Sequence, residues 1–223
     1  MSRRAIGMVV GLLVSTAASA ALVTSSSSFP PGSQVVDFSQ FTGAGEVNGT
    51  NGPVQVGGLV GVDVEFTCTN SAGYLENTSW GFGTNGSWDS GRSGFAGVNG
   101  TGFPMVFTFA APIAAVGGFM NYDPGYGSVT IEALGAGSTV LESYDLTSAA
   151  PISVTGNDNG AFRGIVRQNR DIVAFRVTGA FAGVDDLAIG AGALIPTLSL
   201  AGLAVLATLL AAAGVAVLLL RGE

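Results

Sequence analysis

Short apolar segments separated by glycine, asparagine and serine recur along most of this chain. Between Leu59 and Thr67, apolar residues occupy every second position and Asp63 and Glu65 stand between them. A period of two predicts a strand with one buried face. Further strands are predicted at residues 35–38, 54–56, 105–109, 114–120, 129–134, 139–144, 152–155, 161–167, 172–178 and 184–189. No segment between residues 21 and 194 shows the period of an amphipathic helix.

This number and spacing of strands predict an all-β domain over residues 35–193, a β-sandwich of the jelly-roll type. Residues 135–137 and 168–170 are short enough to form hairpin turns. Residues 70–102 are rich in Asn, Gly and Ser and contain both tryptophans, which predicts either short irregular strands or a functional insertion. Residues 21–34 are expected to form a flexible lead-in.

The two ends of the chain carry targeting patterns. Arg3-Arg4, the apolar stretch 5–14 and the small residues 18–20 predict a signal peptide over residues 1–20. Residues 198–220 form an apolar run that would be about 34 Å long as a helix, enough to cross a bilayer. Arg221 supplies the positive charge expected on the cytoplasmic side.

A four-residue box, Ile195-Pro196-Thr197-Leu198, precedes this run. Together with the apolar span and Arg221, it resembles the IPTL-CTERM sorting signal, a relative of PEP-CTERM on surface proteins of Gram-negative bacteria. The resemblance implies that residues 194–223 are a sorting tail. An exosortase-type transpeptidase would recognise the box and cut nearby, which places the protein at the cell surface or outside the cell. The alternative is a permanent single-span anchor in the inner membrane.

Charge and missing residue types exclude several functions. The chain has 15 acidic residues against eight arginines, no Lys and no His, and a net charge of −7. Such an acidic protein repels phosphate backbones, so nucleic acid is not an expected partner. Without His or Lys there can be no Ser-His-Asp triad, His-ligated zinc or Schiff base. Cys68 is the only cysteine, and its strand-like surroundings predict a buried thiol.

Three segments of the second half, at residues 107–117, 129–133 and 184–190, resemble the β-sandwich bodies that precede such tails. By extension they resemble the galactose-binding-like jelly rolls of carbohydrate-binding modules. That resemblance implies a structural Ca²⁺ held by Asp185 or Asp186 on the closing strand, with Asp37 near the first strand as counterpart. The alternative is an Asp-Asp pair with one exposed carboxylate and one that caps a turn.

Aromatic residues beside polar ones are candidates for glycan binding, because a ring presents a flat apolar face to the C–H groups of a pyranose. The candidates are Trp88, Asp89, Tyr122, Asp123 and Tyr126. Among the rings we expect Trp88 and Tyr126 to be exposed and Trp80 to be buried.

These observations predict a non-catalytic, exported cell-surface or biofilm-matrix protein whose loops bind extracellular polysaccharide. A purely structural matrix protein without a ligand is the alternative. A carboxylate-dependent glycan hydrolase is a more distant alternative. Asp63 and Glu65 share one face of a predicted strand, but the sequence gives no reason to choose one pair of carboxylates over another.

Overall fold

The structure, a computed structural model, describes residues 20–58, 61–89, 94–179 and 181–191. Within these ranges, no helix is long and apolar enough to cross a membrane. Apart from Ala20, the predicted signal peptide lies outside the described residues. The predicted sorting tail, with its box, its apolar run and Arg221, lies outside them as well.

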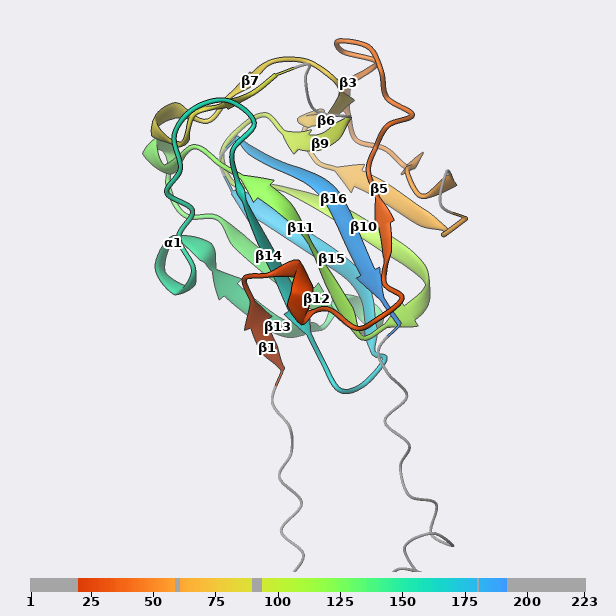
Figure 1. Cartoon of the computed structure of the whole chain (residues 1–223). Helices are drawn as coiled ribbons and strands as arrows, with labels where there is room; N and C mark the ends of the chain where they lie inside the picture. The colour runs from red at the N-terminus through yellow and green to blue at the C-terminus, as the bar shows by residue number, and fades with distance from the viewer. Residues whose placement is uncertain (1–19, 59–60, 90–93, 180, 192–223) are drawn as a thin grey trace, which may run out of the picture. The chain divides into compact units, whose positions relative to one another are not determined.

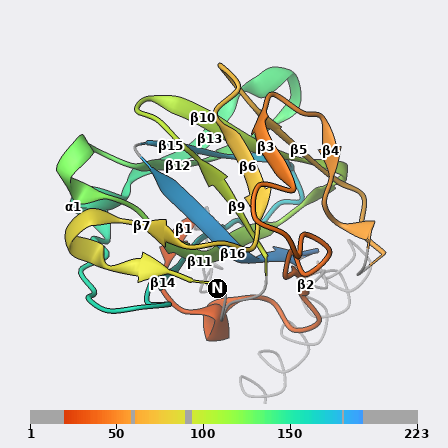
Figure 2. The ribbon, with the colours of Figure 1, turned by 90° about the horizontal axis from the view of Figure 1, so that it is seen from above.

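Two antiparallel sheets form the domain (Figure 1, Figure 2). The larger sheet has the order β1 (Ala21–Val23), β14 (Ala161–Val166), β11 (Ala115–Asn121), β16 (Ala182–Gly190), β9 (Phe95–Val98), β6 (Gly73–Glu76) and β3 (Val47–Thr50), and β2 (Gln34–Val36) also pairs with β16. The smaller sheet has the order β13 (Val140–Asp145), β12 (Thr130–Leu134), β15 (Ile172–Gly179), β10 (Phe103–Ile113), β5 (Val64–Cys68) and β4 (Val54–Gln55).

The remaining elements are short. Strands β7 (Trp80–Gly81) and β8 (Ser87–Trp88) form a small hairpin of their own. The helical turns are η1 (Ser26–Ser28), η3 (Gly83–Asn85), η4 (Pro124–Tyr126), η5 (Ala136–Ser138) and α1 (Leu146–Ala149). The regular structure of the described residues is therefore almost entirely β-strand, as the apolar pattern predicts.

The hydrophobic core lies between the two sheets and is built from alternate strand residues. In β5, Val64, Phe66 and Cys68 are buried while Glu65 and Thr67 are partly exposed, which confirms the predicted period of two. Phe66 and Phe175 pair across the ladder with the central Phe107, and the rings of this row lie 5.6 and 6.5 Å from that of Phe107. Burial raises the pKa of the Cys68 thiol, so the predicted apolar role of this cysteine is confirmed.

Three local predictions are wrong. Residues 152–155 form no strand, because the Ile152 N–H donates to the Tyr122 hydroxyl instead of to a neighbouring strand. Residues 168–170 form no hairpin turn, since Val166 pairs within the larger sheet and Ile172 within the smaller, so the segment crosses between sheets. The lead-in at residues 21–34 contains β1 and η1.

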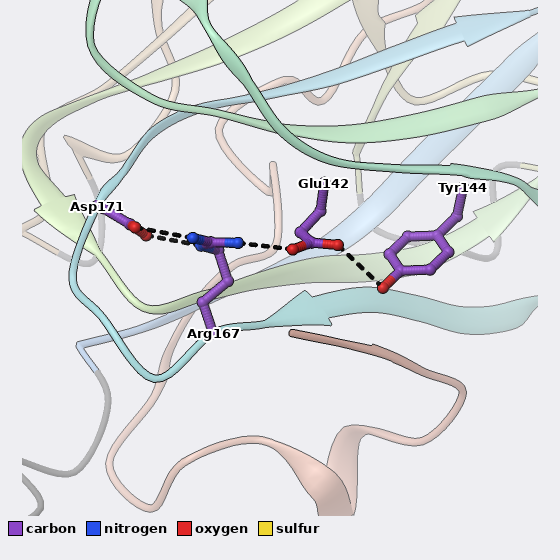
Figure 3. A network of polar contacts seen from close by, with 4 residues as sticks. All are labelled: Glu142, Tyr144, Arg167 and Asp171. Atoms are coloured by element: carbon purple, nitrogen blue, oxygen red, sulfur yellow. Dashed lines mark hydrogen bonds and ion pairs between the residues drawn. The ribbon is translucent and has the colours of Figure 1, made fainter. Parts of the chain in front are cut away.

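An ion-pair network joins the two sheets beside this crossing (Figure 3). Arg167, which follows β14, lies between Asp171 and Glu142 of β13, with N–O distances of 2.7 Å to each. Glu142 also accepts a hydrogen bond from the Tyr144 hydroxyl at 3.3 Å. The hydrogen bond to Asp171 is the main reason that the pKa of Arg167 is raised. One guanidinium therefore links the edge of the smaller sheet to the end of β14.

We predict that Arg167→Ala lowers the free energy of unfolding by about 1–2 kcal/mol, because both carboxylates lose their partner in a partly buried setting. Arg170→Ala is the matched control. It removes an exposed arginine three residues away and should change stability by less than about 0.5 kcal/mol. Chemical denaturation measures both variants, and equal losses would contradict a specific link between the sheets.

A buried carboxylate lies on the larger sheet. Glu76 of β6 is 4% exposed, and its Oε2 accepts a hydrogen bond from the Gly45 N–H at 2.7 Å. Burial disfavours the charged form and raises the pKa of Glu76, and the Gly45 hydrogen bond opposes this only in part.

The raised pKa predicts a pH effect on stability. The native protein holds the Glu76 proton more tightly than the unfolded chain, so this residue's contribution falls as pH rises through the raised pKa. Glu76→Gln cannot ionise and should therefore gain stability relative to the wild type between about pH 4 and pH 7. Asp63→Asn controls for the loss of one negative charge. Thermal unfolding across this pH range provides the measurement, and parallel curves for wild type and Glu76→Gln would refute the prediction.

Candidate functional site

The outer face of the larger sheet is the face turned away from the core. Two glycines on this face leave room for aromatic rings to pack against the backbone. Gly97 of β9 and Gly183 of β16 are directly paired. A Cβ atom at Gly97 would lie 2.6 Å from the Trp80 ring, and one at Gly183 would lie 2.6 Å from the Trp88 ring. Since no larger residue fits, these two glycines let the β7–β8 hairpin pack its indoles closely against the sheet.

The rings form a second, smaller core on this face. Buried Phe82, Trp88 and Phe95 pack together, with Trp80 and Phe119 partly buried against them. The Trp88 ring lies 5.0 Å from Phe82 and 5.3 Å from Phe95 in edge-on geometry, and its Nε1–H donates to the Asn159 carbonyl at 2.8 Å. Trp88 is 0% exposed, so our prediction of an exposed ring is wrong. The prediction that Trp80 is buried is also wrong, since it is half-buried at the cluster's edge.

Buried amides hold the loops at one end of the sheets. Asn85 Nδ2 donates to the carbonyls of Tyr122 and Ile152, at 3.0 and 2.9 Å. Asn121 Nδ2 donates to the carbonyls of Asn85 and Asn159, each at 2.9 Å. Tyr122 is 2% exposed and belongs to this network, so its ring is not an open platform for a sugar. These bonds replace the strand ladder that the loops lack.

The other three glycan candidates, Asp89, Asp123 and Tyr126, each contact different residues. The Asp89 backbone N–H donates to Asp158 Oδ1, and its carboxylate receives Asn157 Nδ2 at 3.4 Å. Asp123 caps η4 by accepting the Gly125 N–H at 2.8 Å. Tyr126 is 58% exposed, as predicted, and its ring contacts Phe181 at 4.7 Å. The structure therefore does not assemble the five predicted residues into one exposed surface.

An aromatic hollow of about 390 Å³ lies elsewhere on the outer face of the larger sheet. Phe119 of β11 and Phe162 of β14 face each other as a directly paired couple on this face. The Phe119 ring stacks on Trp88 at 6.0 Å, and the Phe162 ring meets Phe29 edge-on at 5.0 Å. The hollow is lined by Ser26, Val35, Phe119, Phe162, Asp186 and Ala188.

A β-bulge places the carboxylate of the hollow. Between the pairs Phe119–Asp185 and Gly117–Ala188 the register shifts by one residue, and Asp186 takes a left-handed φ of 48°. Asp185 Oδ1 accepts the Asp186 N–H at 2.7 Å and so stabilises this strained backbone. A bulge reorients the side chains around it, which turns Asp186 to the outer face, where it is exposed.

The three residues expected to hold calcium have different surroundings. Asp185 is 1% exposed, Asp186 is exposed, and Asp37 Oδ1 accepts the Ser39 N–H at 3.1 Å. Asp37 and Asp186 each lie one residue beyond the last pair of the β2–β16 ladder, Val36 and Leu187. Over the described ranges, no three acidic or cysteine side chains come close enough to share a metal ion.

Asp63 and Glu65 line an open hollow of about 160 Å³ on the smaller sheet. Asp63 also borders a neighbouring hollow of about 240 Å³, together with Phe109, Ile113 and Arg170. No shared hydrogen bond between the two carboxylates marks a catalytic pair among the described contacts.

Sequence reasoning missed Phe119 and Phe162. Both occupy outward positions of predicted strands, next to Gly117 and Gly118 in one case and Gly164 in the other. Large aromatic rings at solvent-facing positions beside glycines were the available signal, since a strand that exposes such rings needs something to cover them.

Comparisons of the chain with protein-family models, with curated proteins and with solved structures found no match. The described residues define an all-β protein in which two antiparallel sheets enclose one core. The outer face of its larger sheet carries the aromatic hollow.

We predict that Trp88→Ala lowers the free energy of unfolding by about 3–5 kcal/mol, the usual effect of emptying a large buried site. Tyr126→Ala is the control because its ring is exposed, and we expect it to change stability by about 1 kcal/mol or less. Chemical denaturation of both variants provides the measurement. A loss below about 1 kcal/mol for Trp88→Ala would show that its ring is not part of a packed core.

Proposed function

We propose that this protein is an exported, non-catalytic surface or biofilm-matrix protein that binds extracellular glycan in the hollow between Phe119, Phe162 and Asp186. The observation that carries the proposal is the paired aromatic rings beside an exposed carboxylate on the outer face of the sheet. This site replaces Trp88 and Tyr122, whose rings are buried.

The chemistry of the hollow suits a sugar. A pyranose has a face of C–H groups that packs on aromatic rings, and its hydroxyls donate to carboxylate and serine oxygens. Phe119 and Phe162 supply rings, while Asp186 and Ser26 supply oxygen atoms at the rim. The neighbouring Ala188 is small, which leaves room above the sheet for a ring-sized ligand.

The ends of the chain support delivery outside the cell. The signal peptide at residues 1–20 would direct export, and the tail at residues 194–223 would hold the chain in the inner membrane. An exosortase-type transpeptidase would then recognise Ile195–Leu198 and release or re-attach the domain. The body would act as a galactose-binding-like jelly roll in this arrangement.

The proposal predicts saturable binding of the full chain, kept soluble in mild detergent, to polysaccharide from the native host. Phe162→Ala should weaken this binding about tenfold, because one of the two ring contacts is lost. Tyr126→Ala is the matched control, since it removes an exposed ring that is not among the described residues lining the hollow, and it should bind like the wild type. Isothermal titration or a pull-down on immobilised polysaccharide measures all three proteins.

Other outcomes have distinct meanings. An ordered wild-type protein that binds no polysaccharide would favour a purely structural matrix role. Weaker binding by Tyr126→Ala but not by Phe162→Ala would move the site away from the hollow. Release of reducing ends that stops with Asp63→Asn or Glu65→Gln would indicate a glycan hydrolase. Repeating the titration with calcium and with chelator tests the expected structural Ca²⁺ near Asp37, Asp185 and Asp186.

A further inference from the structure

We infer that the hollow on the outer face selects glycans that carry free amino groups, such as polymers of de-N-acetylated hexosamine. This inference rests on the proposed glycan-binding function and names the ligand class of the same site. It follows from the charge and geometry around Asp186.

The hollow has a negative side chain and no positive one among its described lining residues. Asp186 is exposed, and within the described part of the chain its carboxylate accepts no hydrogen bond. The other lining residues, Ser26, Val35, Phe119, Phe162 and Ala188, are uncharged. A ligand cation would therefore meet an available partner at this carboxylate.

The described arginines are engaged elsewhere. Arg163 is buried and donates to three backbone carbonyls, those of Ala150, Pro151 and Phe162. Arg167 and Arg176 pair with carboxylates, and Arg170 borders the separate hollow beside Asp63. None of these four guanidinium groups lines the hollow at Asp186, so none is placed there to bind a uronate or a sulfate. The net charge of −7 also repels acidic polysaccharides at long range.

An amino sugar matches both parts of the hollow. Its ammonium group can form a charge-assisted hydrogen bond with Asp186, which is stronger than the bond made by a neutral hydroxyl. Its ring can pack on Phe119 and Phe162, and an ammonium near a phenyl face is further stabilised by the ring's electrons. N-acetylation removes the positive charge, so the charge-assisted bond to Asp186 and the stabilisation of the ammonium by the phenyl rings are lost, while the sugar ring can still pack on Phe119 and Phe162.

The backbone holds Asp186 ready for such a ligand. Its left-handed conformation is stabilised by the hydrogen bond to Asp185, which is 1% exposed and directly paired with Phe119. The carboxylate is therefore presented by a strand in the middle of the sheet instead of by a long loop. A group held in place before binding loses less conformational freedom when the ligand arrives.

The test compares the full chain in mild detergent with oligomers of β-1,4-linked glucosamine and with N-acetylglucosamine oligomers of matched length, at pH 5.5. We expect the amino form to bind at least about tenfold more tightly, a difference that shrinks at high salt. Asp186→Asn should lower the affinity for the amino form to that for the acetylated form. It should leave the acetylated form unchanged.

This variant is designed to fold. Asn tolerates the left-handed conformation, and the hydrogen bond to Asp185 comes from the backbone N–H, which the substitution keeps. Asp63→Asn is the matched control, because it removes the same charge from an exposed position on the other sheet. It should retain the preference for the amino form.

Equal affinity for the two oligomers, or the same loss in Asp63→Asn as in Asp186→Asn, would overturn the inference. The first result would leave neutral-glycan binding in place. The second would assign the preference to the overall negative charge of the protein. Failure to bind any glycan, the native polysaccharide included, would remove the proposed function itself.

Discussion

The larger sheet buries side chains on both of its faces, and this requirement shapes the rest of the domain. Its inner face closes the core against the row formed by Phe66, Phe107 and Phe175. On its outer face, the paired glycines Gly97 and Gly183 have no side chains, and this leaves room for the rings of Trp80 and Trp88 to pack against the backbone. A side chain at either glycine would lift the β7–β8 hairpin from the sheet and expose the aromatic cluster.

The β7–β8 hairpin covers only part of the outer face, and the hollow lies beside the covered part. The Trp88 ring supports Phe119 from one side, while Phe29 packs against Phe162 on the other. The two phenyl rings between these supports are only partly covered. The aromatic residues that stabilise the hairpin and those that line the hollow are therefore in continuous contact, and the site depends on the second core for its shape.

The strand pattern was predictable because period and burial coincide. Most strands of both sheets are predictable as short apolar segments between turn residues. In β5 the alternation also agrees with burial, since Val64, Phe66 and Cys68 are the buried residues. Residues 152–155 have the same composition as a strand, yet the Asn85 and Tyr122 side chains satisfy the backbone of Ile152. Both partners lie at least 30 residues away in sequence, so nothing local distinguishes this segment from a strand.

The candidate site was less predictable for a related reason. Trp88 stands in a segment rich in glycine and asparagine, which suggests an exposed loop, but the glycine against which its ring packs, Gly183, belongs to a strand far away in the sequence. Asp186 was found from its place on the closing strand, whereas its orientation depends on a register shift against β11. Such a shift exists only once the strands have paired, and no local pattern in the sequence specifies it.

The register of the larger sheet also fixes where the hollow lies along the strands. Ala21 pairs with Val166, Val166 with Ala115, and Ala115 with Gly190. The first and last strands of the domain therefore each place a residue in the same row of paired residues, at one end of β11. The buried amides of Asn85 and Asn121 hold the loops at the opposite end of β11. The row of Phe162, Phe119 and Asp185 lies between these two ends, so the strand ladder itself fixes the positions of the residues that carry the hollow.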